Sequence, residues 1–187
     1  MAATVTIRSW TGTAGAPTKT DVTSATKRLV TEDAHYSGGT TNPIPVPAAG
    51  SNYSFWPSYR LSADTTPTTQ INNLRFYSDG TSSSPSGVTW LAQTANVTPD
   101  AGYREASGTV GTTGLALNTT NHTGLTAAPV DPFAWTSGSP KTMAGSISNP
   151  STGDFGDFME MQLVVASTTA ATGAITAEQF TVVYDES

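Results

Sequence analysis

The sequence contains no cysteine, and it has only two histidines, His35 and His122. The lack of cysteine excludes disulfide bridges, zinc sites with thiolate ligands and cysteine nucleophiles. Neither histidine lies in an HExxH or HxH pattern, and no GxSxG motif of a hydrolase is present. We expect His122, in the turn-rich run NHTG, to be an exposed loop histidine. The sequence therefore predicts a protein that is not an enzyme, with no catalytic, cofactor-binding or metal-binding residues.

Charged residues are also scarce, and acidic ones prevail. They make up 12% of the chain, with 8 Lys and Arg against 14 Asp and Glu, for a net charge of −6. Binding to a phosphate backbone or to an anionic membrane needs clustered Lys and Arg, so we expect neither a nucleic acid nor a membrane as partner. No apolar run reaches the roughly 18 residues of a membrane span. The first ten residues lack the pattern of a secretory signal, so we expect either a mature fragment or a chain that is made and used without Sec export.

Threonine and serine are abundant instead, with 34 and 20 residues respectively. Threonine is β-branched and fits the half-exposed face of a strand, where other proteins place Lys and Glu. The resulting surface would be polar and neutral, which suits close and permanent contact with other protein. The alternative interpretation is that this composition reflects only turns and β propensity.

The clearest strand pattern lies near the C-terminus. Apolar side chains occupy every second position within Phe158–Ala166, and again within Ile175–Asp185. A period of two places alternate side chains on opposite faces of a strand. The simplest arrangement of two such runs is an antiparallel hairpin with one face turned to a core.

Other segments have weaker versions of the same pattern. Ile71–Asp79 and Val88–Ala95 are predicted strands, and Ala3–Trp10 is either a first strand or an arm. Turn-rich clusters separate these segments, and no persuasive amphipathic helix is present. The sequence thus predicts an all-β fold, an antiparallel β-sandwich resembling a jelly roll, with long loops and an extended N-terminal arm.

Prolines indicate how the chain is divided. Pro43, Pro45 and Pro47 cannot donate hydrogen bonds to a sheet, so this stretch should be extended and peripheral. We expect residues 1–50 to form an extended arm and Pro-rich strap packed on the body, and residues 51–187 to form the β-sandwich domain. The uncharged stretch 106–130 is either a contact surface or a loop packed on its own sheet.

The densest acidic group, Asp154, Asp157 and Glu160, could bind Ca²⁺, although its spacing does not match an EF-hand. The alternative is a turn in which Gly153 and Gly156 adopt unusual backbone angles and the Asp side chains cap the turn.

Four tryptophans could supply a platform for stacking on sugars. Trp90 has the spacing of a core residue, whereas Trp56 and Trp135 lie among turn residues and are better surface candidates.

Two blocks carry a resemblance to a known family. They are NNLRFYSDGTSSSPSGV (72–88) and MEMQLVVASTTAATGAITAEQFTVVYDE (159–186). They resemble β-sandwich virion proteins of tailed bacteriophages, which include capsid decoration (cement) proteins. The resemblance covers residues 50–187, and its motifs are of low specificity.

This resemblance implies a non-enzymatic viral structural protein. Such a protein binds the outside of an assembled capsid lattice, bridges neighbouring copies of the major capsid protein and associates with itself as a homotrimer. Its location would be the capsid surface of the virion, after synthesis in the host cytoplasm. The alternatives are a carbohydrate-binding β-sandwich module that uses surface Trp and Tyr, a tail or head-fibre accessory protein, and a glycosidase-like enzyme with two carboxylates in one cleft.

Overall fold

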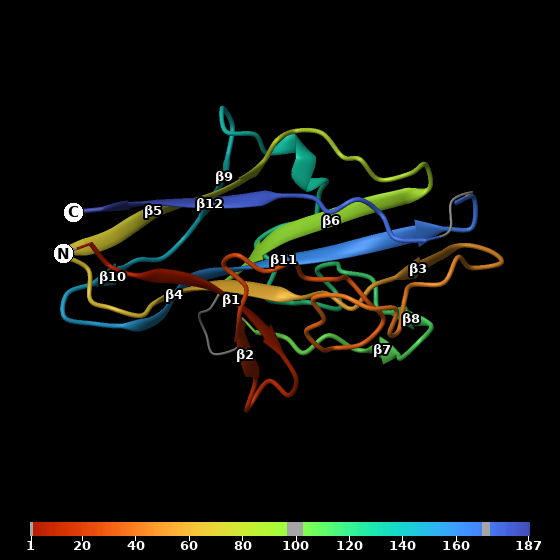
Figure 1. Cartoon of the computed structure of the whole chain (residues 1–187), viewed down its shortest axis with the longest axis horizontal. Coiled ribbons are helices and arrows are strands. Elements are labelled where there is room, and N and C mark those ends of the chain that lie inside the picture. The colour runs from red at the N-terminus through yellow and green to blue at the C-terminus, as the bar shows by residue number, and fades with distance from the viewer. Residues whose placement is uncertain (1, 97–102, 170–172) are drawn as a thin grey trace.

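The computed structural model describes residues 2–96, 103–169 and 173–187. Within these residues, all pairs of strands are antiparallel, and the strands form two main sheets and a small two-stranded one. The two main sheets face each other along the length of the molecule (Figure 1). The predicted all-β fold with antiparallel sheets is therefore confirmed. A jelly-roll strand order stays a prediction.

The larger sheet is built around one long strand. β11 (Gly153–Ala166) pairs along one edge with β4 (Ser58–Ala63) and then with β3 (Ser51–Tyr53). Its other edge pairs with β6 (Val88–Ala95). Beyond β4 the sheet continues with β1 (Val5–Thr11) and β2 (Thr18–Asp21). β11 is therefore the central strand of this sheet.

The smaller main sheet is organised around β5 (Gln70–Ser78). One edge of β5 pairs with β12 (Phe180–Glu186), and the other pairs with β9 (Lys141–Met143) and β10 (Ile147–Ser148). A 3₁₀ turn, η1 (Pro132–Ala134), precedes β9. The short hairpin of β7 (Gly108–Thr109) and β8 (Thr113–Gly114) lies in the loop region that follows β6.

The hairpin predicted from the C-terminal pattern is wrong. β11 and β12 belong to different sheets and do not pair with each other. The reason is that β3, β4 and β6 already occupy both edges of β11. The two apolar faces meet across the sandwich instead, where Met161 lies in the core and Val182 packs against that core. Alternation predicted the faces of both strands correctly but not their partners.

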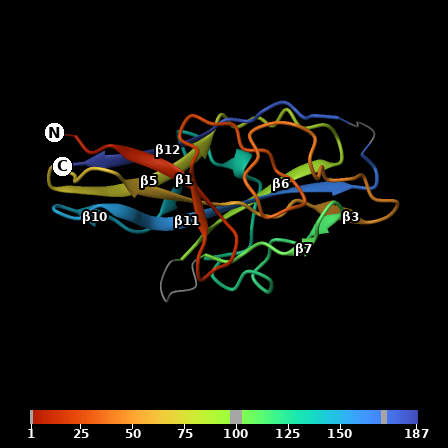
Figure 2. The ribbon, with the colours of Figure 1, turned by 60° about the horizontal axis from the view of Figure 1, so that its bottom comes forward.

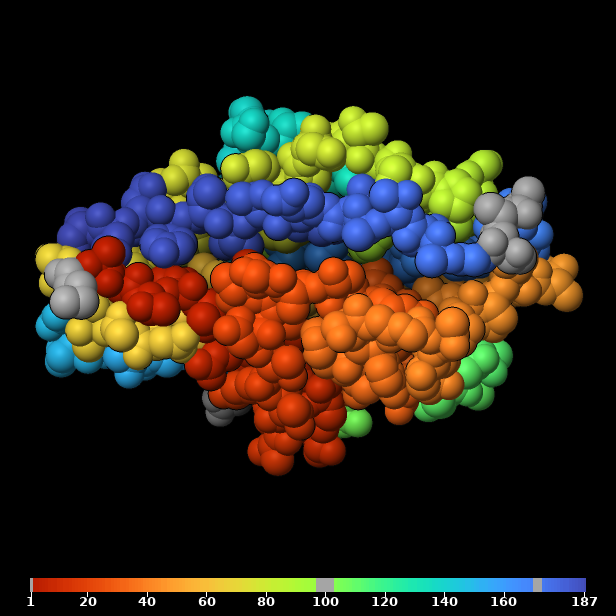
Figure 3. Space-filling view, viewed as in Figure 1, coloured from red at the N-terminus to blue at the C-terminus, as the bar shows by residue number. Residues whose placement is uncertain are grey.

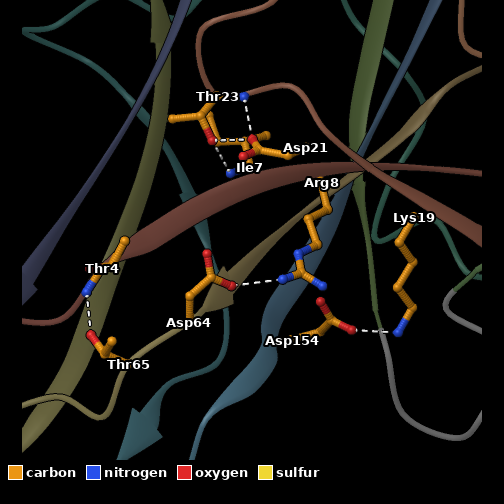
Figure 4. Close-up of polar contacts among 9 residues, drawn as sticks. All are labelled: Thr4, Ile7, Arg8, Lys19, Asp21, Thr23, Asp64, Thr65 and Asp154. Carbon is orange, nitrogen blue, oxygen red and sulfur yellow. Dashed lines mark hydrogen bonds and ion pairs between the residues drawn. The ribbon is translucent and has the colours of Figure 1, made fainter.

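The N-terminal residues are part of the sandwich. Of the two alternatives for Ala3–Trp10, the structure has the strand, because β1 pairs with β4 over Val5–Trp10. Residues 5–21 therefore extend the larger sheet, whereas the sequence placed them in an arm. Figure 4 shows the polar contacts that fix this part, including the ion pairs Arg8–Asp64 and Lys19–Asp154, at 2.7 and 2.6 Å. Residues 22–50 contain no strand and pack on the body.

Gly145 and Gly156 allow the loop between β9 and β10 to approach β11 closely. A Cβ atom on Gly145 would lie 2.6 Å from the Cα of Gly156, so a side chain there would collide with backbone. Gly153 and Gly156 both have positive φ, 108° and 75°, as the sequence indicated. Asp157 follows them and accepts a hydrogen bond from the N–H of Ala144. This contact fixes the loop before β10 against β11.

The larger sheet is covered on both faces. Its inner face, with Leu61, Met159 and Met161, packs on Leu74 and Phe76 of β5. Its outer face carries a second cluster in which Phe158 contacts the rings of Trp10 and Tyr103. Burial on both faces explains why β11 tolerates a nearly continuous run of buried residues.

A substitution in this second cluster tests how much it contributes. Phe158 is 2% exposed, so Phe158→Ala should lower the free energy of unfolding by about 3–5 kcal/mol through lost burial and a cavity. Arg75→Ala, which breaks a partly exposed ion pair with Asp185 in the smaller sheet, should cost about 1 kcal/mol or less. Urea denaturation of both variants measures the difference. Similar midpoints for the two variants would contradict a stabilising second layer.

Candidate functional site

A cleft of about 1410 Å³ lies between the two main sheets. Its floor is the inner face of the larger sheet, with Met161, Leu163 and Val165 of β11 and Trp90 of β6. Val182 of β12 and Phe76 of β5 face this floor from the smaller sheet. The sequence predicted this apolar face of β11 but not the cleft above it.

Two segments without regular secondary structure border the cleft. One is the cover segment, residues 22–46, which contributes apolar side chains such as Val22, Ile44 and Val46. The other is the rim segment, residues 173–179, which leads into β12. Figure 3 shows the groove between the orange cover segment and the blue C-terminal residues. Figure 2, after a 60° turn, shows the cover segment crossing the same side of the sandwich. Met161, Leu163 and Val165 of the floor are 4–6% exposed, so these borders overhang them.

One side of the cleft is an unpaired strand edge. Among the described residues, β12 pairs with β5 alone, so its other edge has no strand partner. The rim segment pairs with no strand, although the sequence predicts a strand from Ile175 onward. Glu178 attaches this segment to the loop before β6 by accepting hydrogen bonds from the N–H and Oγ of Ser83. Residues 174–179 thus lie beside the apolar floor without regular secondary structure, and the strand begins at Phe180.

Two cations line the opposite border. Lys27 Nζ donates to the carbonyl of Ala34 at 2.8 Å, and Arg28 Nη1 donates to the carbonyl of Gly38 at 3.3 Å. Within the described part of the chain, neither forms an ion pair with a carboxylate. Burial lowers the pKa of Lys27 to about 8, and the nearby charge of Asp33 opposes part of this shift. The cleft border therefore carries positive charge although the whole chain is acidic.

The outer face of the larger sheet carries a buried polar layer. Gln162 accepts a hydrogen bond from the N–H of Leu117 and donates to the carbonyls of Ser54 and Leu115. Gln93 donates to the carbonyl of Ala128 in the same way. These amides attach the uncharged stretch 106–130 to its own sheet. Of the two interpretations for that stretch, packing on the sheet is observed, while Val110 and Leu115 remain exposed.

His122 lies in this layer, so its expected exposure is wrong. It is fully buried, with Nε2 3.3 Å from Oε1 of Glu160, and its ring lies 5.8 Å from that of Trp56. Ser58 Oγ donates to the other oxygen of Glu160 at 2.7 Å. Burial raises the pKa of Glu160, while His122 and Ser58 lower it in part. Ser, Glu and His thus meet, and solvent reaches neither His122 nor Glu160. Histidine in a polar loop gave no signal of this burial.

The three acids considered for Ca²⁺ do not converge. Asp154 pairs with Lys19, Asp157 contacts the N–H of Ala144, and Glu160 faces His122. No group of three or more His, Cys, Asp or Glu that could hold a metal ion occurs in residues 2–96, 103–169 and 173–187. The alternative, in which Gly153 and Gly156 adopt positive φ and Asp157 caps a backbone N–H, agrees with the structure.

The tryptophans do not form a flat exposed platform. Trp56 is 2% exposed, so its proposed surface position is wrong, and its Nε1 donates to the carbonyl of Arg104. Trp10 is also buried. Trp90 and Trp135 are half-buried and contact other rings, Trp90 against Phe133 and Phe180 and Trp135 against Phe76.

Comparison with family models, with curated proteins and with solved structures finds no match. In the described residues, no helix has the length and hydropathy needed to cross a membrane. A function has to be argued from the geometry of the chain itself.

The buried amide of Gln162 provides a test of the polar layer. Gln162→Leu would leave one N–H and two carbonyls of the protein without their partner, each at a cost of about 1–3 kcal/mol. We expect a loss of about 3–5 kcal/mol in the free energy of unfolding, measured by urea denaturation. The control Gln179→Leu, at an exposed position, should change stability by about 0.5 kcal/mol or less. A stable Gln162→Leu variant would show that the layer does not fix the loop.

Asp33 of the cover segment makes stability depend on pH. Burial raises its pKa from 3.8 to about 6, although the N–H of Gly12 donates to Oδ2 at 2.7 Å. An acid whose folded pKa is raised favours the fold when protonated, and this contribution is lost as the pH rises from about 4 to about 6. Asp33→Asn keeps an acceptor for Gly12 and removes the charge.

We therefore expect Asp33→Asn to be more stable than the natural chain at pH 7, by about 1 kcal/mol after allowance for partial exposure. The advantage should vanish near pH 4. Urea denaturation of both proteins at pH 4, 5, 6 and 7 measures it. A constant difference across this range would contradict the raised pKa of Asp33.

Proposed function

We propose that the protein is a non-enzymatic viral structural protein that binds the outside of an assembled capsid lattice and stabilises it. The observation that carries the proposal is the distribution of its polar groups. Three ionisable side chains are enclosed in the fold: His122 lies against Glu160, and Asp157 accepts a hydrogen bond from the N–H of Ala144. The exposed surface is rich in hydroxyl groups and poor in charge.

This distribution supports a role in permanent protein contact. Interfaces made of hydroxyl and amide groups avoid the cost of removing charges from water. The exposed Val110 and Leu115, beside the uncharged β7–β8 hairpin, add apolar contact area of the kind found in interfaces. A protein that binds the assembled lattice and not its separate subunits stabilises the lattice by mass action. Many copies on one shell add their effects through multivalency.

The partners in this proposal are the major capsid protein and further copies of the chain, as a homotrimer on the capsid surface. The carbohydrate-binding alternative requires exposed and coplanar rings, and none of the four tryptophans offers them. We do not propose it as a second function.

Two measurements test the proposal. The molecular mass of the purified protein in solution, measured by light scattering, should be three times the chain mass of 19.3 kDa. Gold-labelled antibody against the purified protein should decorate the capsid surface in electron micrographs of virus particles from its natural source. A monomer that is absent from every particle would overturn the proposal, and labelling confined to tails would place the protein elsewhere on the virion.

A further inference from the structure

We propose that the cleft binds an extended segment of a partner protein, which pairs with the backbone along residues 175–182 and places apolar side chains on the floor. The segment would alternate apolar and polar residues and carry an acidic side chain next to Lys27 and Arg28. This inference rests on the proposed function, because it describes the part of a neighbouring virion protein that the chain would hold.

The first argument is the coincidence of an apolar floor and an unpaired backbone. A strand edge presents a row of N–H and C=O groups that can pair with another chain. Peptides that add a strand to such an edge gain affinity from backbone hydrogen bonds and specificity from side chains that enter neighbouring pockets. Here the edge of β12 borders a floor made by Met161, Leu163 and Val165, so both contributions are available in one place.

The second argument comes from the rim segment. Residues 175–179 have the sequence of a strand but no strand partner, and the regular strand begins only at Phe180. Backbone without a hydrogen-bond partner in the protein leaves its N–H and C=O groups to water. A partner segment along residues 175–182 would complete the strand that the sequence predicts.

Size and charge decide what kind of ligand fits. The cleft measures about 1410 Å³, whereas clefts for small molecules measure about 300–1,000 Å³. A fatty acid would use the floor but would leave the backbone edge unpaired. The described lining of the cleft includes Lys27, Arg28 and Arg60, against the carboxylate of Glu178. The net charge of this lining is therefore positive, which favours an acidic partner segment.

The experiment uses the full chain and a displayed library of random nine-residue peptides. Selection on the immobilised protein should enrich peptides with alternating apolar residues and at least one Asp or Glu. A synthetic copy of an enriched peptide should slow amide hydrogen exchange along residues 175–182. Arg28→Glu should weaken its binding at least tenfold. Arg104→Glu, an equal change of charge at an exposed position outside the cleft, should leave binding within twofold.

The backbone edge has its own test. When residues 175–182 pair with the partner segment as a strand, neighbouring N–H groups point in opposite directions, so either Thr176→Pro or Ala177→Pro removes a donor to that segment. Neither residue pairs with β5, so both variants should keep the fold by circular dichroism. One of them should lose peptide binding. Binding retained by both variants would overturn the inference.

Other outcomes also overturn it. These are enrichment without an acidic or alternating pattern, binding of palmitate when no peptide is selected, and protection of residues 175–182 by a second copy of the chain alone. The particle-labelling experiment stays separate. Arg28→Glu protein that still decorates capsids would leave the proposed function intact and exclude the cleft from attachment.

Discussion

The structure depends on the enclosure of β11. Strands lie along both of its edges, and packed layers lie on both of its faces. Its inner side chains join the core between the sheets, whereas Phe158, Glu160 and Gln162 face the loops outside the larger sheet. Because every direction around the strand is filled, β11 determines where the other elements can lie. The second C-terminal strand consequently pairs in the other sheet.

On the outer face of the larger sheet, buried polar side chains form hydrogen bonds with the backbone of the loops that cover it. Residues 106–130 contain no charged side chain and little regular structure, so their backbone groups need partners that a sheet does not supply. Gln93 and Gln162 provide such partners from inside the sheet. The same layer holds the buried Glu160, which accepts a hydrogen bond from Ser58 and lies 3.3 Å from Nε2 of His122.

Over Leu163 and Val165 the inner face is bordered by loop segments, and this arrangement connects the fold with the proposed role. The cover segment and the rim segment overhang the floor, but neither pairs with the edge of β12. A sandwich that is closed on one side by loops and left open beside a strand edge is suited to receive another chain. The neutral hydroxyl-rich surface would then carry the wider contacts, and the cleft would supply specificity.

The sequence alone determined the class of fold and the faces of its clearest strands. Alternation in Phe158–Ala166 and Val88–Ala95 placed the correct side chains toward the core, because the period of a strand is a local property. Tertiary structure decided which strands pair, that Ala3–Trp10 joins the sheet, and that Trp56 and His122 are buried. The position of the cleft and the contacts of Asp154, Asp157 and Glu160 also follow from the tertiary structure. These outcomes depend on which strand edges and sheet faces remain free after distant segments have packed. A local sequence pattern contains no information about those distant segments.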